Sequence, residues 1–410
     1  MKVPMMKWLL LGGVTLTLAA CAASGARTPQ PDRARFVGSL FSGQEQYENF
    51  ARIGAIFPTA PVTAPAKAFQ FPEGARATLP PTFNYEGQPV DTAAFLSETD
   101  TAALLVLKDG KVRYEHYALS GGRNVRWLSM SVAKSFISAL VGIAVEEGHI
   151  KSIEDPITRY LPELAGSAYQ DVRIKDVLQM SSGASWNENY GDPQSDVSRL
   201  GMVMARGGSF NSIPAGLKRD HAPGTFNRYN SAETQVLGML LKKATGRSIA
   251  SYMTEKLWQP LGAETNAAWV IDDTGMEMAF AGLTATARDY AKLGELYRLR
   301  GNWHGRQIIP AKWVEASVSP DAPHLMPGAR PNADSPMGYG YQWWVPAGSD
   351  GEFSAIGVYN QFIYVNPSKN IVIVKLSANS DYAQTNEEKS FRELETIELF
   401  RAIGTGMREP

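Results

Sequence analysis

Helix-forming and apolar residues dominate residues 132–147, and this pattern predicts a largely buried helix. Gly148 supplies the stop, because glycine readily adopts the left-handed conformation that ends helices. Residues 286–299 have the apolar spacing of an amphipathic helix, and a last helix is expected at about residues 387–402. The pattern thus places helices in the middle of the chain and near its C-terminal end.

Alternating apolar positions predict strands on both sides of these helices. Residues 102–107 and 111–118 flank Asp109-Gly110, a strong signal for a β-hairpin. Further strands joined by turns are expected at residues 338–345, 353–365 and 370–378. Residues from about 153 to 300 read mainly as helix and loop. The pattern therefore predicts an α+β fold: an antiparallel sheet closed by both ends of the chain and flanked by helices, with an inserted, mainly helical region.

The first residues have the features of a targeting segment. Lys2 and Lys7 give a basic start, and the apolar residues 8–20 are too few to span a bilayer comfortably. Leu-Ala-Ala-Cys at residues 18–21 resembles a bacterial lipoprotein processing site. We therefore expect residues 1–20 to be a lipoprotein signal peptide and Cys21 to carry the lipid. An ordinary secretory leader with an incidental cysteine is the alternative.

Lipidation of Cys21 would anchor a protein domain to a membrane of the bacterial cell envelope, facing the periplasm. The proline-rich residues 57–65 indicate an extended segment draped on the main domain. We accordingly divide the rest of the chain into an N-terminal arm or linker, residues 21–85, and one main domain, residues 86–405.

Composition excludes several classes of protein. The net charge is −1, with 40 Lys and Arg against 41 Asp and Glu, and no basic stripe suggests a nucleic-acid partner. Cys21 is the single cysteine, so no internal disulfide can form, and the 5 histidines show no zinc spacing. We expect no metal and no organic cofactor, and a small-molecule substrate.

Ser131 and Lys134 stand three residues apart at the start of the predicted helix. A serine in the first turn places its backbone N–H, and the positive end of the helix dipole, beside an oxyanion formed on it. Lys134 returns to the same helix face, within reach of the serine hydroxyl. An amine desolvated by apolar neighbours has a lowered pKa and could accept the serine proton. The pair predicts a serine acyl-transfer enzyme; a solvated surface lysine is the alternative.

Further motifs follow this pair in a fixed order. They are Asp176 to Gly183, Pro-Gly-Thr at residues 223–225, Tyr-x-Ser at 229–231, Leu-Gly at 237–238, residues 282–289 and residues 338–344. Together they resemble the serine β-lactamase and penicillin-binding-protein superfamily, in its class C-like branch of esterases and amidases. Ser231 and residues 185–193 are most similar to the hydrolases of 6-aminohexanoate oligomers. The resemblance spans about residues 102–402 and implies a β-lactamase/transpeptidase-like fold.

The resemblance also implies roles for individual residues. Ser131 would be the nucleophile, Lys134 its base, and Tyr229 the group that returns the proton to the leaving group. The backbone N–H groups of Ser131 and Val358 would form the oxyanion hole. A phenol with a pKa of about 10 can act in this way only if Lys134 and the helix dipole favour its anion or a shared proton. A merely packing role for Tyr229 is the alternative.

Substrate contacts are expected from five residues around this centre: Trp186, Tyr190, Ser231, Ile356 and Gly357. Two departures from the family pattern bear on the substrate. Ala355-Ile356-Gly357 stands where relatives carry a cation before Thr-Gly, and Ser231 stands where they carry asparagine. Both disfavour β-lactam substrates and leave acyl transfer intact.

We therefore expect a serine hydrolase that cleaves an ester or a linear amide through an acyl-enzyme on Ser131. A β-lactamase or a D-alanyl-D-alanine carboxypeptidase is the second reading. A catalytically silent binding lipoprotein on the same fold is the third.

Overall fold

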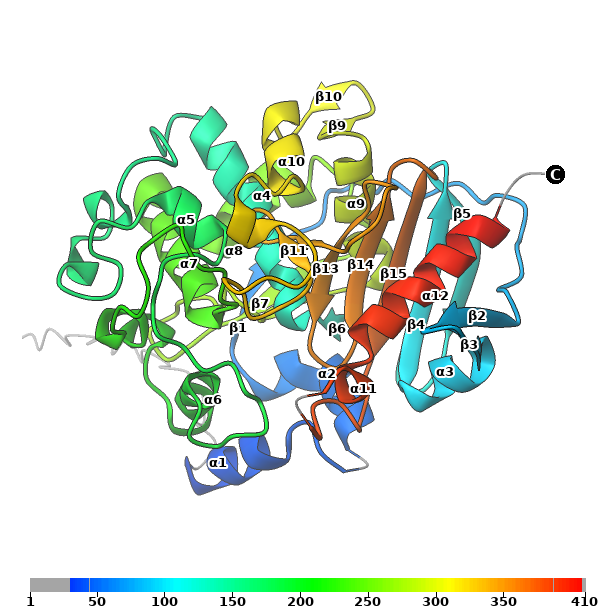
Figure 1. Ribbon diagram of the computed structural model, residues 1–410, viewed down its shortest axis with the longest axis horizontal. Coiled ribbons are helices and arrows are strands. Elements are labelled where there is room, and N and C mark those ends of the chain that lie inside the picture. The colour runs from blue at the N-terminus through cyan, green and yellow to red at the C-terminus, as the bar shows by residue number, and fades with distance from the viewer. Residues whose placement is uncertain (1–29, 44, 386, 408–410) are drawn as a thin grey trace, which may run out of the picture.

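A seven-stranded antiparallel sheet forms the centre of the computed structural model, which describes residues 30–43, 45–385 and 387–407 (Figure 1). The strands run in the order β11 (Gly338–Tyr339), β12 (Trp344–Val345), β13 (Phe353–Gly357), β14 (Gln361–Asn366), β15 (Ile371–Ser377), β4 (Thr101–Lys108) and β5 (Lys111–Tyr117). Strand β15 pairs with β4, so both ends of the chain close the sheet, as predicted. The expected hairpin turns at Asp109-Gly110, and both residues have positive φ angles.

Helices cover both faces of this sheet. Helix α9 (Ala287–Arg298) packs on one face against Val372 and Val374, and α12 (Glu393–Gly406) crosses the other against Ile371 and Ile373 (Figure 1). Successive side chains of a strand point to opposite faces, so the apolar residues 371–374 of β15 contribute side chains to the core on both faces of the sheet. The fold class predicted from the sequence is thereby confirmed.

The inserted region between β5 and β11 is mainly helical, as expected. Its helices are α4 (Ala133–Glu146), α5 (Ile174–Leu178), α6 (Asp196–Arg206), α7 (Ser231–Thr245), α8 (Ile249–Met253), α9 and α10 (Ala311–Ser317). The short strands β6 (Trp127–Leu128), β7 (Ala267–Val270) and β8 (Leu283–Ala285) join β1 (Thr59–Val62) in a second sheet. Two-stranded ribbons complete the strands: β2 (Thr82–Tyr85) with β3 (Gln88–Asp91), and β9 (Asn302–Trp303) with β10 (Arg306–Gln307).

Gln342 fixes the turn between β11 and β12 onto three helices. Its side-chain amide donates to the carbonyl of Leu178 in α5 (2.8 Å), and its amide oxygen accepts from Thr234 in α7 (2.6 Å). Its backbone carbonyl accepts from Ser135 in α4 (2.7 Å). Gln342 is buried and has a φ of +62°. The turn therefore acts as a fixed joint between the sheet and the helices that carry Ser131 and Tyr229.

Three segments predicted as continuous are interrupted. Residues 338–345 and 353–365 each form two short strands, and the second pair turns at Tyr359 and Asn360, both with a φ of +63°. The last helix is divided into α11 (Glu388–Phe391) and α12 by Arg392, with a φ of +53°. None of these turning residues is a glycine, so the usual sequence signal for a positive φ is missing.

The N-terminal segment is more structured than the sequence indicated. Helices α1 (Gln30–Ser39) and α2 (Gln46–Ile56) precede β1, which pairs with β7, and a short helix α3 (Thr92–Glu98) precedes β4. Phe50 of α2 is fully buried and stacks on Trp127, with ring centroids 5.3 Å apart. Part of the predicted arm thus contributes to the core next to the segment that leads to Ser131.

Residues 1–20 and Cys21 lie outside the described residues, so the signal peptide and the lipid anchor stay predictions. Within the residues described, no helix combines the length and the apolarity needed to cross a bilayer.

We expect Phe50→Ala to lower the free energy of unfolding by about 3–5 kcal/mol, the usual cost of truncating a buried phenylalanine. The neighbouring Arg52→Ala is the control: its side chain is 55% exposed, and the change should stay within about 0.5 kcal/mol. Urea unfolding of both variants measures this difference. Equal midpoints would show that α2 is not part of the cooperative core.

Candidate active site

Ser131 lies in a tight turn between β6 and α4. The turn is a 3₁₀ segment, Met130–Val132, and the preceding Met130 has a φ of +46°. Gly357, at the end of β13, approaches this turn closely: a Cβ there would lie 2.9 Å from the backbone nitrogen of Ser131. Only glycine permits this approach without displacing the turn. The predicted Gly357 therefore lies where the end of β13 meets the predicted nucleophile.

The amine of Lys134 is buried and hydrogen-bonded on three sides. It lies 2.8 Å from Oγ of Ser131, 3.1 Å from Oγ of Ser231 and 3.0 Å from the carbonyl oxygen of Phe280. The residue is only 2% exposed, which excludes a solvated surface lysine. Burial lowers the pKa of Lys134 to about 7, although the charge of Glu188 opposes this shift.

The neighbours of Lys134 determine which way its protons point. The hydroxyl of Ser231 donates to Oε1 of Glu188 (2.6 Å), so toward Lys134 it can only accept. The carbonyl of Phe280 also accepts only. An uncharged amine has two N–H groups and one lone pair, and these two acceptors use both N–H groups. The lone pair is left for the hydroxyl proton of Ser131.

Tyr229 lies over the amine of Lys134. The nitrogen of Lys134 is 4.9 Å from the centroid of the Tyr229 ring, and the ring stacks on Trp344 at 5.1 Å. Burial raises the pKa of Tyr229 well above its ordinary value, and the charge of Glu188 adds to this; the hydroxyl of Ser131 has a smaller opposing effect. Of the two states considered from the sequence, an anion or a shared proton, the anion is disfavoured by burial and by the negative charge of Glu188. Burial therefore favours the neutral phenol of Tyr229.

Glu188 is the residue of this centre that sequence reasoning missed. Its carboxylate accepts from the backbone N–H (3.0 Å) and hydroxyl of Ser231, from the phenol of Tyr190 (2.6 Å), and from the indole N–H of Trp186. The spacing Trp186, Glu188, Tyr190 was the available signal. In this irregular segment the two aromatic donors, each two residues from Glu188, reach its carboxylate from either side along the chain.

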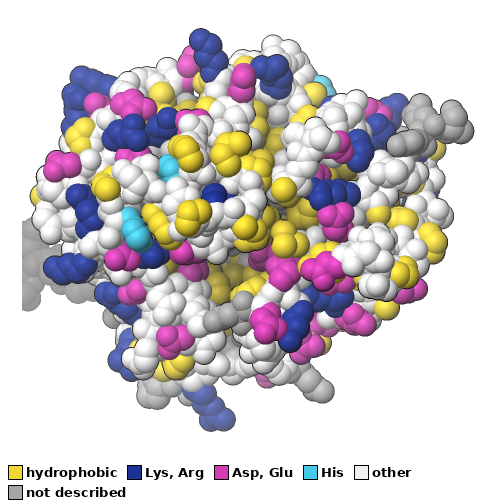
Figure 2. Space-filling view, in the orientation of Figure 1, with side chains coloured by type: hydrophobic (Ala, Val, Ile, Leu, Met, Phe, Trp, Pro, Cys, Tyr) yellow, Lys and Arg dark blue, Asp and Glu magenta, His cyan; other side chains and the backbone are white. Residues whose placement is uncertain are grey.

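A cavity of about 350 Å³ opens over Ser131. Five predicted site residues line it: Ser131, Tyr190, Tyr229, Ile356 and Val358. The remaining walls are Asp334, Ser335, Pro336, Met337, Trp344, Tyr382, Glu388, Phe391, Glu393 and Leu394. Figure 2 shows apolar side chains gathered near the middle of this face, beside a group of acidic ones.

The other predicted residues stand behind this wall. Lys134, Ser231 and Gly357 support the reacting serine from within, and Trp186 is buried and binds Glu188. Trp186 therefore holds the carboxylate in place instead of lining the cavity.

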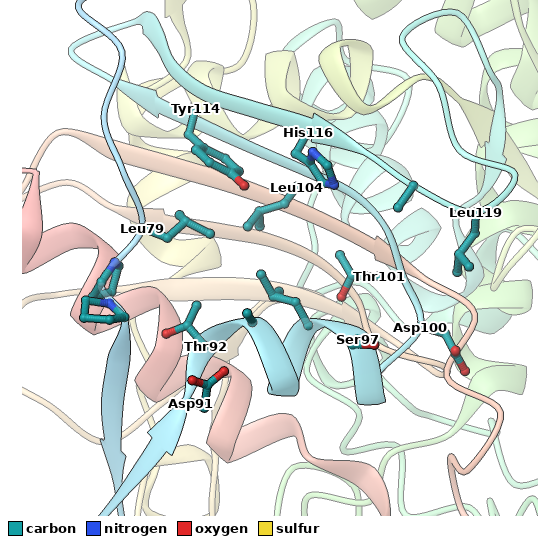
Figure 3. A pocket seen from close by; sticks show the side chains of 15 residues that line it. Leu79, Asp91, Thr92, Ser97, Asp100, Thr101, Leu104, Tyr114, His116 and Leu119 are labelled. Carbon is teal, nitrogen blue, oxygen red and sulfur yellow. The ribbon is translucent and has the colours of Figure 1, made fainter.

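A larger cavity of about 620 Å³ lies elsewhere, between α3 and strands β4 and β5 (Figure 3). Ser97, Asp100 and His116 line it, which invites comparison with a catalytic triad. Asp100, however, accepts hydrogen bonds from Tyr47 (3.1 Å) and from the backbone N–H (2.9 Å) and hydroxyl (2.8 Å) of Ser380. The carboxylate of Asp100 is thus bound by Tyr47 and Ser380 and does not serve as the acid of a triad. The cavity over Ser131 is therefore the candidate active site.

Comparison with known proteins agrees with this geometry. Residues 93–397 match the family described as Beta-lactamase. The chain is 32% identical to 6-aminohexanoate-dimer hydrolase of Paenarthrobacter ureafaciens over 379 residues, which cover 87% of this chain and 93% of the relative. A β-lactamase of Escherichia coli K12 is 25% identical over 46% of this chain and 47% of its own. The chain belongs to the β-lactamase family, and it is a hydrolase of that superfamily.

Solved structures confirm the β-lactamase/transpeptidase-like fold. A Bacillus anthracis protein assigned as a 6-aminohexanoate-dimer hydrolase superposes with a TM-score of 0.80 at 24% identity, covering 93% of this chain and all (100%) of that one. A family VIII carboxylesterase superposes with a TM-score of 0.59 at 16% identity, covering 77% and 95%. The resemblance read from the motifs is confirmed at the level of family and fold.

We expect Ser131 to react with a fluorophosphonate at a rate that rises with pH, with a midpoint near the pKa of about 7 of Lys134, because only the uncharged amine accepts the serine proton. Glu188→Gln should move this midpoint to lower pH, since it removes the negative charge that favours the ammonium form.

Glu154→Gln is the control, because Glu154 is 55% exposed and pairs with Arg173 on the surface. The labelling rate, measured from about pH 5 to pH 9 by intact mass, gives all three midpoints. A midpoint in Glu188→Gln equal to or above that of the unaltered protein contradicts this electrostatic account.

Proposed function

We propose that the protein hydrolyses an ester or a linear amide through a covalent acyl-enzyme on Ser131. The observation that carries this proposal is the hydrogen-bond pattern at Lys134. As an ammonium, Lys134 donates to all three partners. In the uncharged form its two N–H groups serve Ser231 and the carbonyl of Phe280, and its lone pair is left toward the hydroxyl of Ser131. A serine hydroxyl is a weak nucleophile until an adjacent base takes its proton, and this arrangement provides that base.

In the first step, Oγ of Ser131 attacks the substrate carbonyl while its proton moves to Lys134. The tetrahedral oxyanion is stabilised by the backbone N–H groups of Ser131 and Val358. Ser131 lies directly before the N-terminus of α4, whose dipole adds positive potential at the same place. Gly357 permits this geometry, because a side chain there would displace the turn that carries Ser131.

Collapse of the tetrahedral intermediate expels the alcohol or amine. Tyr229 protonates this leaving group and recovers a proton from the ammonium of Lys134, over which its ring lies. The raised pKa of Tyr229 keeps the phenol neutral and able to donate this proton. Water, activated at the same pair of residues, then attacks the acyl-enzyme and releases the acid.

The walls of the cavity favour an uncharged reacting region over a β-lactam carboxylate. The charged residues that line the cavity are Asp334, Glu388 and Glu393, all of them acidic. Ile356 lines it at the third family motif, where relatives carry a cation one position earlier. The likeness to a 6-aminohexanoate-dimer hydrolase over most of the chain adds linear amides to the proposed substrates.

Ser131→Ala should abolish the single fluorophosphonate adduct, and Lys134→Ala should slow labelling by at least about a hundredfold, the usual scale for loss of a general base. Ser97→Ala is the matched control, because Ser97 lines the other cavity and should leave labelling unchanged. Intact mass spectrometry measures the adduct. An adduct that survives in Ser131→Ala would mean that another residue is the nucleophile.

In a substrate screen, we expect p-nitrophenyl butyrate to be cleaved with a higher kcat/KM than nitrocefin. A charge-assisted contact to the β-lactam carboxylate is worth about 1.5–3 kcal/mol, so its absence costs roughly ten- to a hundredfold. A linear amide of two 6-aminohexanoate units completes the screen. Faster turnover of nitrocefin than of the ester would instead support the β-lactamase reading, and silence toward all substrates with unlabelled Ser131 would support a binding protein.

A further inference from the structure

Five residues at and shortly before the start of α12 form one wall of the cavity over Ser131, and the proposed reaction does not use their chemistry. Tyr382, Glu388, Phe391, Glu393 and Leu394 all line the cavity. This wall is acidic and aromatic. It comes from the connection between β15 and α12 and from the first residues of α12, far in the sequence from the motifs of the reacting groups.

Glu393 is the acid of this wall whose negative charge affects the pKa of a reacting group, Tyr229. Its Oε1 accepts the phenol proton of Tyr382 (2.6 Å), and its negative charge raises the pKa of Tyr229. A carboxylate can accept about four hydrogen bonds, so the bond from Tyr382 orients Glu393 and leaves it acceptor capacity toward the cavity. Glu388 is used differently, because its Oε1 accepts the backbone N–H of Leu394 (2.5 Å) at the start of α12.

The basic groups near this wall are directed elsewhere. Arg392 lies over the ring of Phe95 at 4.5 Å and pairs with Glu395 (2.7 Å) and Glu98 (2.8 Å). The third acid of the cavity, Asp334, is already paired with Arg228 at 3.1 Å. Within the described residues, Glu393 forms no salt bridge and lies in a cavity that no lysine or arginine lines. A positively charged group on the substrate would therefore find an unpaired carboxylate in this cavity, that of Glu393.

We propose that Glu393, oriented by Tyr382, binds a cationic amino group on the substrate and so determines specificity for amine-bearing esters or amides. The proposal rests on the proposed function of Ser131 and names the substrate class for that site. An ammonium held beside a partly desolvated carboxylate makes a charge-assisted hydrogen bond, which is stronger than the contact of a methyl group with the same wall.

This preference should depend on pH. Burial, and then the neighbouring charge of Glu388, raise the pKa of Glu393 to about 7, while Tyr382 donates a hydrogen bond that opposes the shift. Burial likewise raises the pKa of Glu388 to about 7. The other titratable groups on the cavity, Tyr190, Tyr229 and Asp334, face the same space. Glu393 therefore gains its charge as the pH rises through about 7, where an alkylammonium keeps its proton.

The test compares matched substrates in which a terminal ammonium is exchanged for a methyl group. One series carries the amine on the acyl chain, as p-nitrophenyl esters of ω-amino acids of four to six carbons against the isosteric alkanoates. The other carries it on the leaving group, as acetates of ω-amino alcohols against those of alkanols. The ratio of kcat/KM within each pair cancels the titration of Lys134, which affects both members equally.

We expect one series to favour the amine by about tenfold or more above pH 8, with a ratio that falls as the pH drops below about 7. Glu393→Gln should remove this preference and its pH dependence while the neutral esters are still cleaved. Glu387→Gln, a change at an exposed neighbour paired with Lys389 at 2.6 Å, should retain both.

A preference absent from both series, or one that persists in Glu393→Gln, overturns the specificity proposal. Cleavage of the neutral esters by the unaltered protein separates this result from failure of the proposed function, since those esters need Ser131 and not Glu393. If the unaltered protein cleaves no neutral ester, the proposed function itself is rejected.

Discussion

The burial of one amine, that of Lys134, is the constraint on which the rest of the site depends. Lys134 can hold the hydroxyl proton of Ser131 only if it is unprotonated and its lone pair points at Ser131. Burial among apolar residues of α4 meets the first condition by lowering the pKa to about 7. The acceptors Ser231 and Phe280 meet the second by using both N–H groups. Neither condition would hold for a lysine exposed to water.

Glu188 couples these two conditions. Its carboxylate takes the proton of Ser231 and so makes that hydroxyl an acceptor toward Lys134. The same charge raises the pKa of Lys134 and limits the lowering caused by burial. The result is an amine that changes its protonation close to neutral pH, where a general base is most effective. Because the unfolded chain would keep this lysine protonated up to a pKa of about 10.4, folding releases its proton between about pH 7 and pH 10, and stability from this group increases across that window.

The fold brings three segments that are distant in the sequence together around the amine of Lys134. Ser131 comes from the turn before α4 and Lys134 from its first turn. Tyr229 and Ser231 come from the entry to α7, and Gly357 from the end of β13. Gln342 ties α4, α5 and α7 to the turn between β11 and β12. Phe50 packs α2 behind Trp127 on the other side. Lys134, with its lowered pKa, and the neutral phenol of Tyr229 thus lie close together, and the charged residues on the cavity wall toward Glu393 are all acidic.

The sequence by itself determined the fold class and the family, and it predicted the reacting trio. Periodicity fixed the hairpin at Asp109-Gly110 and the helix after Ser131, and the order of the motifs brought Lys134 and Tyr229 to the same serine. Signals of this kind can be read from the sequence alone, because helix periodicity and glycine turns depend on only a few neighbouring residues. Only the tertiary structure decided the role of Glu188, the neutral state of Tyr229, the supporting place of Trp186 and the turns at Tyr359 and Arg392. These features depend on burial and on hydrogen-bond partners that are far apart in the chain, such as Glu188 and Ser231. Desolvation and proton direction are properties of the assembled pocket, and no single segment of the sequence contains them.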